Sequence, residues 1–381
     1  MKTATLHKLA LATALSIVAT ACSAPAPRGD IDAAPSSVAV DDVQAKAAAF
    51  EQVMQQHAIP GAQLGWWHGG VFREFDHGVL RKDEPAAVAP QTVFEAASLS
   101  KVVGAYIALR LVDAGKLDLD TPLWDYWHSP RTKDNPQARK ITARMVLNHT
   151  TGLVNWQVDP TDPKLDAAPL ESVFAPGQRY AYSGEGFYLL QKTLEHISGL
   201  DWNALAQREV FVPLDMPSSR YITDKAFDAV NSTGHRQDGT PRRPRVFPTA
   251  NTAWTLTSNV HDYGSFIQRG LFKGEGLKPG TRALMLAESS NADDKYAPSA
   301  ADPFVSWGLG VGLQTTAAGK RAWHWGDNPG FKAFFMLDPD NGDSIILFTN
   351  SENGPATYKQ VLELFLGAGD YPAVDWVQSQ S

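Results

Sequence analysis

Segments with the pattern of β-strands lie near both ends of this 381-residue chain, and helix-length segments separate them. Near the start, residues 62–67 and 71–75 predict a β-hairpin that turns at two consecutive glycines. Near the end, apolar and aromatic segments predict three more strands: 322–325, 331–337 and 344–349. We therefore expect one antiparallel sheet built from both chain ends, in an α/β fold of the α+β type. A mainly helical subdomain, at about residues 118–300, is inserted between the two halves of the sheet.

Helices are expected to flank this sheet. Three segments have helical spacing of apolar residues and helix-terminal signals: 41–57, 98–114 and 357–366. Inside the inserted subdomain, residues 184–199 form the clearest helical stretch. These segments place a single folded domain at residues 41–370, followed by a C-terminal tail at 371–381.

The first 21 residues have the pattern of a secretory signal peptide. Two lysines precede a short apolar run, residues 9–19, which is too short to span a bilayer as a stable anchor. Ala19-Thr20-Ala21 suits ordinary signal peptidase, and the same triplet before Cys22 also resembles a bacterial lipobox. We expect an exported bacterial protein with a lipid on Cys22, periplasmic or anchored at the outer membrane. Soluble secretion after ordinary cleavage is the alternative.

Composition excludes several other classes of function. Cys22 is the only cysteine, so the chain can form neither an internal disulfide nor a cysteine-based metal site. Lys plus Arg number 34 against 41 Asp plus Glu, a net charge of -7, which argues against a nucleic-acid partner. Residues 22–40 are rich in Ala, Pro and Ser and predict a flexible tether.

Ser98 and Lys101 form a candidate catalytic pair. They are three residues apart at the start of a predicted helix, so their side chains share one face. A serine hydroxyl needs an adjacent base to become a nucleophile. A lysine whose pKa is lowered by burial can be that base once it is neutral. Ser-x-x-Lys also arises by chance, so a capping serine and a solvent-facing lysine remain the alternative for this motif alone.

Two further motifs can complete such a site. Tyr182 stands in a loop before a helix, where a tyrosine beside a lysine can shuttle a proton. His324 opens a His-Trp-Gly sequence on a predicted strand, and Gly326 would let a substrate approach the backbone. The backbone N–H just past Gly326 could polarise a carbonyl together with the N–H of Ser98. For each motif alone, a packing role is the alternative.

In this order, Ser-x-x-Lys, Tyr-Ser-x and His-x-Gly resemble the motifs of the penicillin-recognising serine hydrolases. That family includes class C β-lactamases, D-alanyl-D-alanine carboxypeptidases, D-aminopeptidases and related esterases. Connecting stretches are similar to the family's as well: residues 147–153 (LNHTTGL), 182–190 (YSGEGFYLL) and 307–312 (WGLGVG). The resemblance covers about residues 45–368 and implies a β-lactamase-like fold.

The resemblance also implies a role for each motif residue. Ser98 would be the acylated nucleophile, and Lys101 its base or the partner that tunes the base. Tyr182 would relay a proton to the leaving group and activate the deacylating water. The backbone N–H groups of Ser98 and Asp327 would form the oxyanion hole, with His324 and Gly326 beside the substrate. No metal or cofactor is implied, and His149 is expected to brace the loop under the site.

Three positions depart from the class C β-lactamase pattern. Gly184 stands where those enzymes carry Asn, and His324 where they carry Lys. A neutral imidazole holds a carboxylate less well than an ammonium. Trp325 replaces a small residue. We therefore expect an ester- or amide-cleaving hydrolase, an esterase or D-amino-acid peptidase rather than an efficient β-lactamase. The alternatives are a class C-like β-lactamase and a non-catalytic cell-wall-sensing or scaffold module. The expected partner is a small-molecule or peptide substrate: an ester, a D-amino-acid peptide or a β-lactam.

Overall fold

The computed structural model describes residues 40–224, 230–293 and 298–380. The predicted signal peptide at 1–21, the lipidation site at Cys22 and the tether up to residue 39 lie outside the described residues. Within the described part, no helix combines the length and apolar character needed to cross a membrane.

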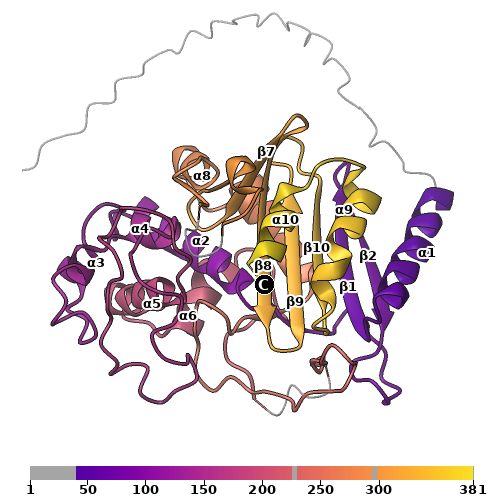
Figure 1. Ribbon diagram of the computed structural model, residues 1–381, viewed down its shortest axis with the longest axis horizontal. Helices are drawn as coiled ribbons and strands as arrows, with labels where there is room; N and C mark the ends of the chain where they lie inside the picture. The colour runs from indigo at the N-terminus through magenta and orange to yellow at the C-terminus, as the bar shows by residue number, and fades with distance from the viewer. Residues whose placement is uncertain (1–39, 225–229, 294–297, 381) are drawn as a thin grey trace, which may run out of the picture. The chain divides into compact units, whose positions relative to one another are not determined.

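The centre of the fold is an eight-stranded antiparallel sheet to which both ends of the chain contribute (Figure 1). Its strand order is β2-β1-β10-β9-β8-β7-β6-β5. The strands are β1 Gly61–His68, β2 Val71–Gly78, β5 Ser290–Asn291, β6 Val305–Trp307, β7 Gly312–Thr316, β8 Gly319–Asn328, β9 Phe331–Leu337 and β10 Ser344–Thr349. The first strand pairs with the last, from Ala62 opposite Thr349 to Trp67 opposite Ser344. The predicted sheet of both chain ends is thereby confirmed.

Helices cover both faces of this sheet. On one face lie α1 (Val40–Gln56), α9 (Tyr358–Leu366) and α10 (Pro372–Ser379), packed on alternate strand residues such as Trp323 and Phe334. On the other face lie α2 (Leu99–Asp113) and α7 (Val260–Ser265), packed on the strand residues of opposite orientation. Because successive strand side chains point to opposite faces, the apolar strands near the C-terminus can serve both layers.

The inserted lobe beside the sheet is made of one long helix, α5, and several short ones, joined by irregular segments (Figure 1). Its helices are α3 Leu123–Tyr126, α4 Ala143–Leu147, α5 Gly184–Ser198, α6 Trp202–Ala206 and α8 Pro279–Met285. The lobe also has a 3₁₀ segment at Ala138–Lys140 and π-helical segments at Gln207–Phe211 and Phe266–Phe272. Further 3₁₀ segments, Asp302–Phe304 and Gly354–Thr357, lie outside the lobe. The lobe contributes one strand to a second, two-stranded sheet, in which β3 (Phe94–Glu95) pairs with β4 (Thr257–Ser258).

The end of the chain differs from the expected tail. Residues 371–381 were expected to extend beyond the domain, yet residues 372–379 fold as α10. Pro372 occupies the first turn, where its missing N–H costs no hydrogen bond. Val374, Trp376 and Val377 are all buried. This spacing gives the eight-residue helix an apolar face, which packs on β6, β7 and β8 of the sheet (Figure 1).

Candidate active site

Ser98 lies at the start of α2, directly after a strained turn. Ala97 has a φ of 50°, a left-handed conformation that costs a residue with a side chain of order 1–3 kcal/mol. The Ser100 hydroxyl donates to the Ala97 carbonyl and accepts from the N–H of Leu256, which holds the turn in place. The hydroxyl of Ser98 is thus presented at the N-terminal end of a helix that is itself buried in the core.

Lys101 lies one helical turn further on and contacts Ser98 directly. Its Nζ donates to Ser98 Oγ at 3.0 Å and to the Ala253 carbonyl at 2.8 Å. The side chain is buried, and this burial lowers the pKa of Lys101 from 10.5 to about 7. A large fraction of the amine is therefore uncharged near neutral pH and can accept the serine proton. The structure brings this predicted pair into hydrogen-bonding contact.

Tyr182 approaches the same two groups from the loop before α5. Its ring lies 4.8 Å from Lys101 Nζ, measured to the ring centroid. The Tyr182 hydroxyl is buried without a hydrogen bond of ordinary geometry among the described residues. Burial raises the pKa of this hydroxyl well above 10, with the nearby Ser98 hydroxyl opposing the rise and the charge of Asp327 adding to it. Tyr182 is therefore protonated at neutral pH and can donate a proton.

His149 packs against the ring of Tyr182. The two rings stack with centroids 4.3 Å apart, and His149 Nδ1 accepts the backbone N–H of Ser183 at 3.1 Å. His149 is fully buried, and this burial lowers its pKa well below 6.5. The charges of Lys101 and His324 lower the pKa of His149 further. The predicted bracing role of His149 is confirmed.

Gly326 allows β8 to pass close to the serine turn. A Cβ atom at this position would lie 2.4 Å from the Ala96 carbonyl oxygen and 3.2 Å from the Ala97 Cβ. No larger residue fits without moving either β8 or the start of α2. Gly326 and Asp327 accordingly line the same cavity as Ser98. The two backbone segments expected to form the oxyanion hole therefore lie side by side.

His324 differs from the expectation that it lies beside the substrate. It is fully buried and does not line the cavity. Its ring stacks on Trp325 with centroids 5.1 Å apart, and its Nδ1 lies 2.7 Å from the Trp325 carbonyl. Burial, and then the charge of Lys101, lower the pKa of His324 to about 3. The imidazole of His324 is therefore neutral. It reaches the cavity only through its ring contacts with Tyr182 and Trp325, which line the cavity.

Ser98 opens into a cavity of about 300 Å³. Its walls come from the helical lobe, from β8 and β9, and from the C-terminal helix. The lining residues are Ser98, Asn155, Tyr182, Trp325, Gly326, Asp327, Lys332, Pro355, Tyr358, Trp376, Val377 and Gln380. Sequence reasoning missed several of these, above all Asn155, Lys332 and Trp376, because none stands in a motif with the serine. A polar residue just after the 147–153 stretch was the only available signal for Asn155.

The structure explains the missing asparagine of the second motif. A Cβ atom on Gly184 would lie 2.4 Å from the nearest atom of the Trp156 indole, which fills that space. The neighbouring Asn155 lines the cavity instead, and its Oδ1 accepts the N–H of Gly184 at 2.8 Å. Asn155 therefore supplies to the cavity wall the side-chain amide that Gly184, the last residue of the second motif, lacks.

A chain of ion pairs leads away from the cavity. Lys332 pairs with Asp327 and, at 2.6 Å, with Glu352. Glu352 in turn accepts from Arg242 at 2.7 Å and from the backbone N–H of Gly330 at 2.8 Å. The ammonium of Lys332 is therefore already neutralised by two carboxylates. Among the described residues, no group of three or more His, Cys, Asp or Glu side chains could hold a metal ion.

Comparison with known proteins identifies the family of this chain. The model of the Beta-lactamase family matches residues 47–365, so the chain belongs to this family of penicillin-recognising serine hydrolases. "Penicillin-binding protein 4" of Amycolatopsis lactamdurans is 25% identical over 343 residues, which cover 84% of this chain and 88% of that protein.

Two solved structures show the same fold. The crystal structure of SurE has a TM-score of 0.73 at 24% identity and covers 87% of this chain and 78% of that one. The D-alanine carboxypeptidase AmpC from Burkholderia cenocepacia has a TM-score of 0.71 at 19% identity, over 86% and 99% of the two chains. At these identities the likeness concerns the fold alone. The β-lactamase-like fold predicted from the sequence is confirmed.

Proposed function

We propose that this protein cleaves an ester or amide through an acyl-enzyme on Ser98. The observation that carries the proposal is the 3.0 Å contact between Ser98 Oγ and the Nζ of Lys101, a lysine whose pKa is lowered by burial to about 7. A buried, partly neutral amine at this distance is a general base in contact with its nucleophile.

The steps follow from the positions of the groups. Neutral Lys101 accepts the proton of Ser98 as Oγ attacks the substrate carbonyl. The negative charge that develops on the carbonyl oxygen is directed toward the backbone N–H groups of Ser98 and Asp327. Protonated Tyr182 donates to the leaving alcohol or amine, and the resulting ester on Ser98 is hydrolysed by water with the proton transfers reversed.

The cavity favours an esterase or D-amino-acid peptidase over an efficient β-lactamase. His324 is neutral, and the charge of Lys332 is taken up by Asp327 and Glu352, so among the described residues that line the cavity no unpaired cation holds a substrate carboxylate. A hydrogen bond to a charged group contributes about 1.5–3 kcal/mol, which corresponds to roughly a tenfold to hundredfold loss in acylation. Trp325 and Trp376, with ring centroids 5.4 Å apart, present an apolar wall instead.

The test is acylation by a panel of p-nitrophenyl esters, D-alanyl peptides and β-lactams, followed by intact-mass measurement. We expect fast turnover of esters or D-amino-acid peptides, a slower mass shift with penicillins, and neither with Ser98→Ala. A protein that neither turns over any of these substrates nor gains mass on Ser98 would instead be the non-catalytic wall-sensing or scaffold module. Penicillin hydrolysis faster than ester hydrolysis would make it a class C-like β-lactamase.

We further propose that the protein is exported and carries a lipid on Cys22. The support is sequence alone: a signal-peptide pattern whose cleavage triplet ends at the only cysteine of the chain. Expressed at full length in a Gram-negative host, the protein should fractionate with membranes and gain the mass of a lipid. Cys22→Ser should be found in the soluble fraction. Equal fractionation of the two proteins would exclude lipidation.

A further inference from the structure

A second cavity, larger than the one that contains Ser98, is lined in part by β3. Its volume is about 590 Å³, within the range of small-molecule sites. The walls come from β3, from residues 231–247 and from the turn between β8 and β9. It shares no lining residue with the cavity that contains Ser98.

Arginines dominate the charge of this second cavity. Four of the ten residues from 236 to 245 are arginines, and all four line it: Arg236, Arg242, Arg243 and Arg245. The only acidic residue in the lining is Glu95. The formal charge of the lining is thus +3 in a chain whose net charge is -7. Guanidinium groups gathered in a concave surface create a positive potential that attracts anions.

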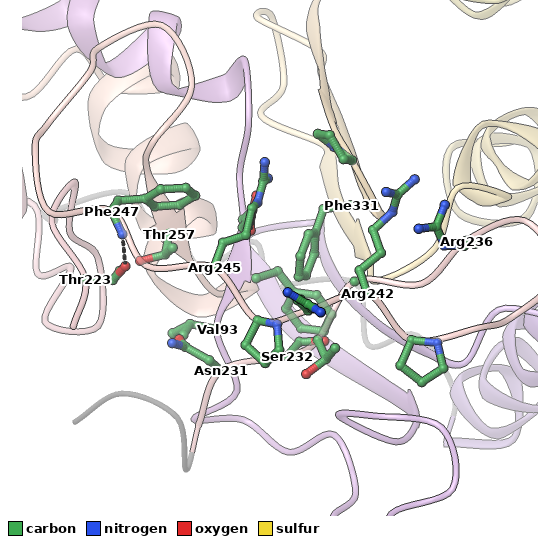
Figure 2. Close-up of a pocket in the computed structure, with 18 of the residues that line it drawn as sticks. Val93, Thr223, Asn231, Ser232, Arg236, Arg242, Arg245, Phe247, Thr257 and Phe331 are labelled. Atoms are coloured by element: carbon green, nitrogen blue, oxygen red, sulfur yellow. Dashed lines mark hydrogen bonds and ion pairs between the residues drawn. The ribbon is translucent and has the colours of Figure 1, made fainter. Parts of the chain in front are cut away.

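The arginines differ in what they already bind. Arg245 Nε donates to Glu95 at 3.1 Å, and Arg242 donates to Glu352 at 2.7 Å. Arg242 also has a buried Nε without a hydrogen-bond partner among the described residues. Arg236 and Arg243 are exposed at the cavity. Figure 2 shows Arg242 and Arg245 on either side of Phe331, with Arg236 beyond Arg242.

The segment that carries the arginines is held in shape. Pro241 and Pro244 fix their own backbone φ angles, on either side of Arg242 and Arg243. The N–H of Arg242 donates to the Gly234 carbonyl at 2.7 Å. A segment ordered before binding loses less conformational entropy when a ligand arrives. The backbone that carries these arginines is therefore restrained before a ligand arrives.

We propose that this arginine-lined cavity binds the phosphate group of a phosphate-bearing ligand. Guanidinium groups donate pairs of parallel hydrogen bonds to phosphate oxygens. Arg242 and Arg245 are already paired with Glu352 and Glu95, so the charges of Arg236 and Arg243 remain for a ligand. A doubly charged tetrahedral anion matches these two charges better than a singly charged carboxylate does. The volume beyond the phosphate leaves room for the rest of the ligand.

The test is calorimetric titration with inorganic phosphate at constant ionic strength, using sodium acetate as the singly charged comparison. We expect phosphate to bind at least tenfold more tightly than acetate. The double variant Arg236→Ala/Arg243→Ala should weaken phosphate binding at least tenfold. Both side chains are exposed, so thermal unfolding should show the variant to be folded. Arg139→Ala, which removes an exposed arginine outside the cavity, is the matched control and should bind as the wild type does.

The same titration on protein whose Ser98 Oγ has been phosphonylated by a fluorophosphonate, with loss of fluoride, separates the two cavities. Phosphate binding that survives phosphonylation and is lost in the double variant supports the proposal. Binding that is blocked by phosphonylation, that is unchanged in the double variant, or that is no tighter than acetate binding overturns it.

Discussion

The chemistry of the site rests on the charge state of one side chain. An exposed lysine has a pKa near 10.4 and is almost entirely protonated at pH 7. Burial beside Ser98 lowers the pKa of Lys101 to about 7, because the charged form loses its hydration. The ammonium form of Lys101 still has two partners: the Tyr182 ring, whose centroid is 4.8 Å from Nζ, and the Ala253 carbonyl. Lys101 can therefore exist in both the charged and the neutral state.

This pKa predicts the pH dependence of acylation. Only neutral Lys101 accepts the serine proton, so kcat/KM for a p-nitrophenyl ester should rise about tenfold per pH unit below pH 7 and level off above it. Lys101→Arg keeps its proton at every pH used, so its rate should fall about 10²–10⁴-fold without recovery at high pH. A wild-type profile that is flat between pH 5 and 9 would contradict this role of Lys101.

Position 184 has no room for the asparagine of the second motif, because the Trp156 indole fills the space beside Gly184. Because a Cβ would lie 2.4 Å from Trp156, Gly184→Asn should destabilise the fold by about 1–3 kcal/mol and should not speed penicillin acylation. Adding Trp156→Ala should cost less than the two single changes together, as thermal unfolding would measure. Gly280→Ala is the control, since a Cβ there has no neighbour within 4 Å. An unchanged melting temperature in Gly184→Asn would show that Trp156 moves freely.

Among the secondary-structure elements, α10 contributes the most cavity-lining residues that lie outside the sequence motifs. Trp376 is fully buried, donates its Nε1–H to the Ala292 carbonyl at 3.2 Å and forms part of the catalytic cavity wall. Trp376→Ala should lower the free energy of unfolding by about 3–5 kcal/mol and raise KM for small apolar esters. Gln378→Ala, on the exposed side of the same helix, should change neither. Unchanged KM in a folded Trp376→Ala protein would remove α10 from the substrate site.

The elements also show how far the sequence alone could be interpreted. Ser98, Lys101 and Tyr182 were predictable because each stands in a short motif at the start of a helix. A sheet built from both chain ends was predictable because strands at both ends need partners, whereas the pairing of β1 with β10 comes from the structure. Asn155, Lys332 and Trp376 were not, because they reach the cavity through contacts between distant segments. The burial of His324 was not predictable either, since a motif does not say which layer packs over its strand.

At the scale of the whole molecule, a continuous series of ion pairs connects residues that line the Ser98 cavity with residues that line the arginine-lined cavity. Asp327 and Lys332 line the catalytic cavity, Arg242 lines the arginine-lined cavity, and Glu352 bridges Lys332 and Arg242. A second connection runs from Arg245 through Glu95 to Asn328, the residue after Asp327. A change of charge in either cavity therefore acts on groups that position the other.

Glu352 is the group on which this connection depends, and acid should weaken it. Burial raises the pKa of Glu352, but the hydrogen bond and charge of Lys332, the N–H of Gly330 and the hydrogen bond from Arg242 outweigh it, so the pKa is lowered below 4.5. The folded state thus favours the carboxylate more than the unfolded state does. The resulting stability is fully present above the ordinary pKa and is lost as pH falls through the lowered one.

Glu352→Gln should therefore be less stable than the wild type by about 1.5–3 kcal/mol at pH 7, and the difference should shrink toward pH 3. Urea unfolding at pH 7, 5, 4 and 3 measures this convergence. Glu363→Gln, at an exposed position of α9, should follow the wild type at every pH. If the deficit of Glu352→Gln were the same at pH 3 as at pH 7, the carboxylate charge would not be what holds Lys332 and Arg242 together. The bridge between the cavities would then be one of packing rather than of charge.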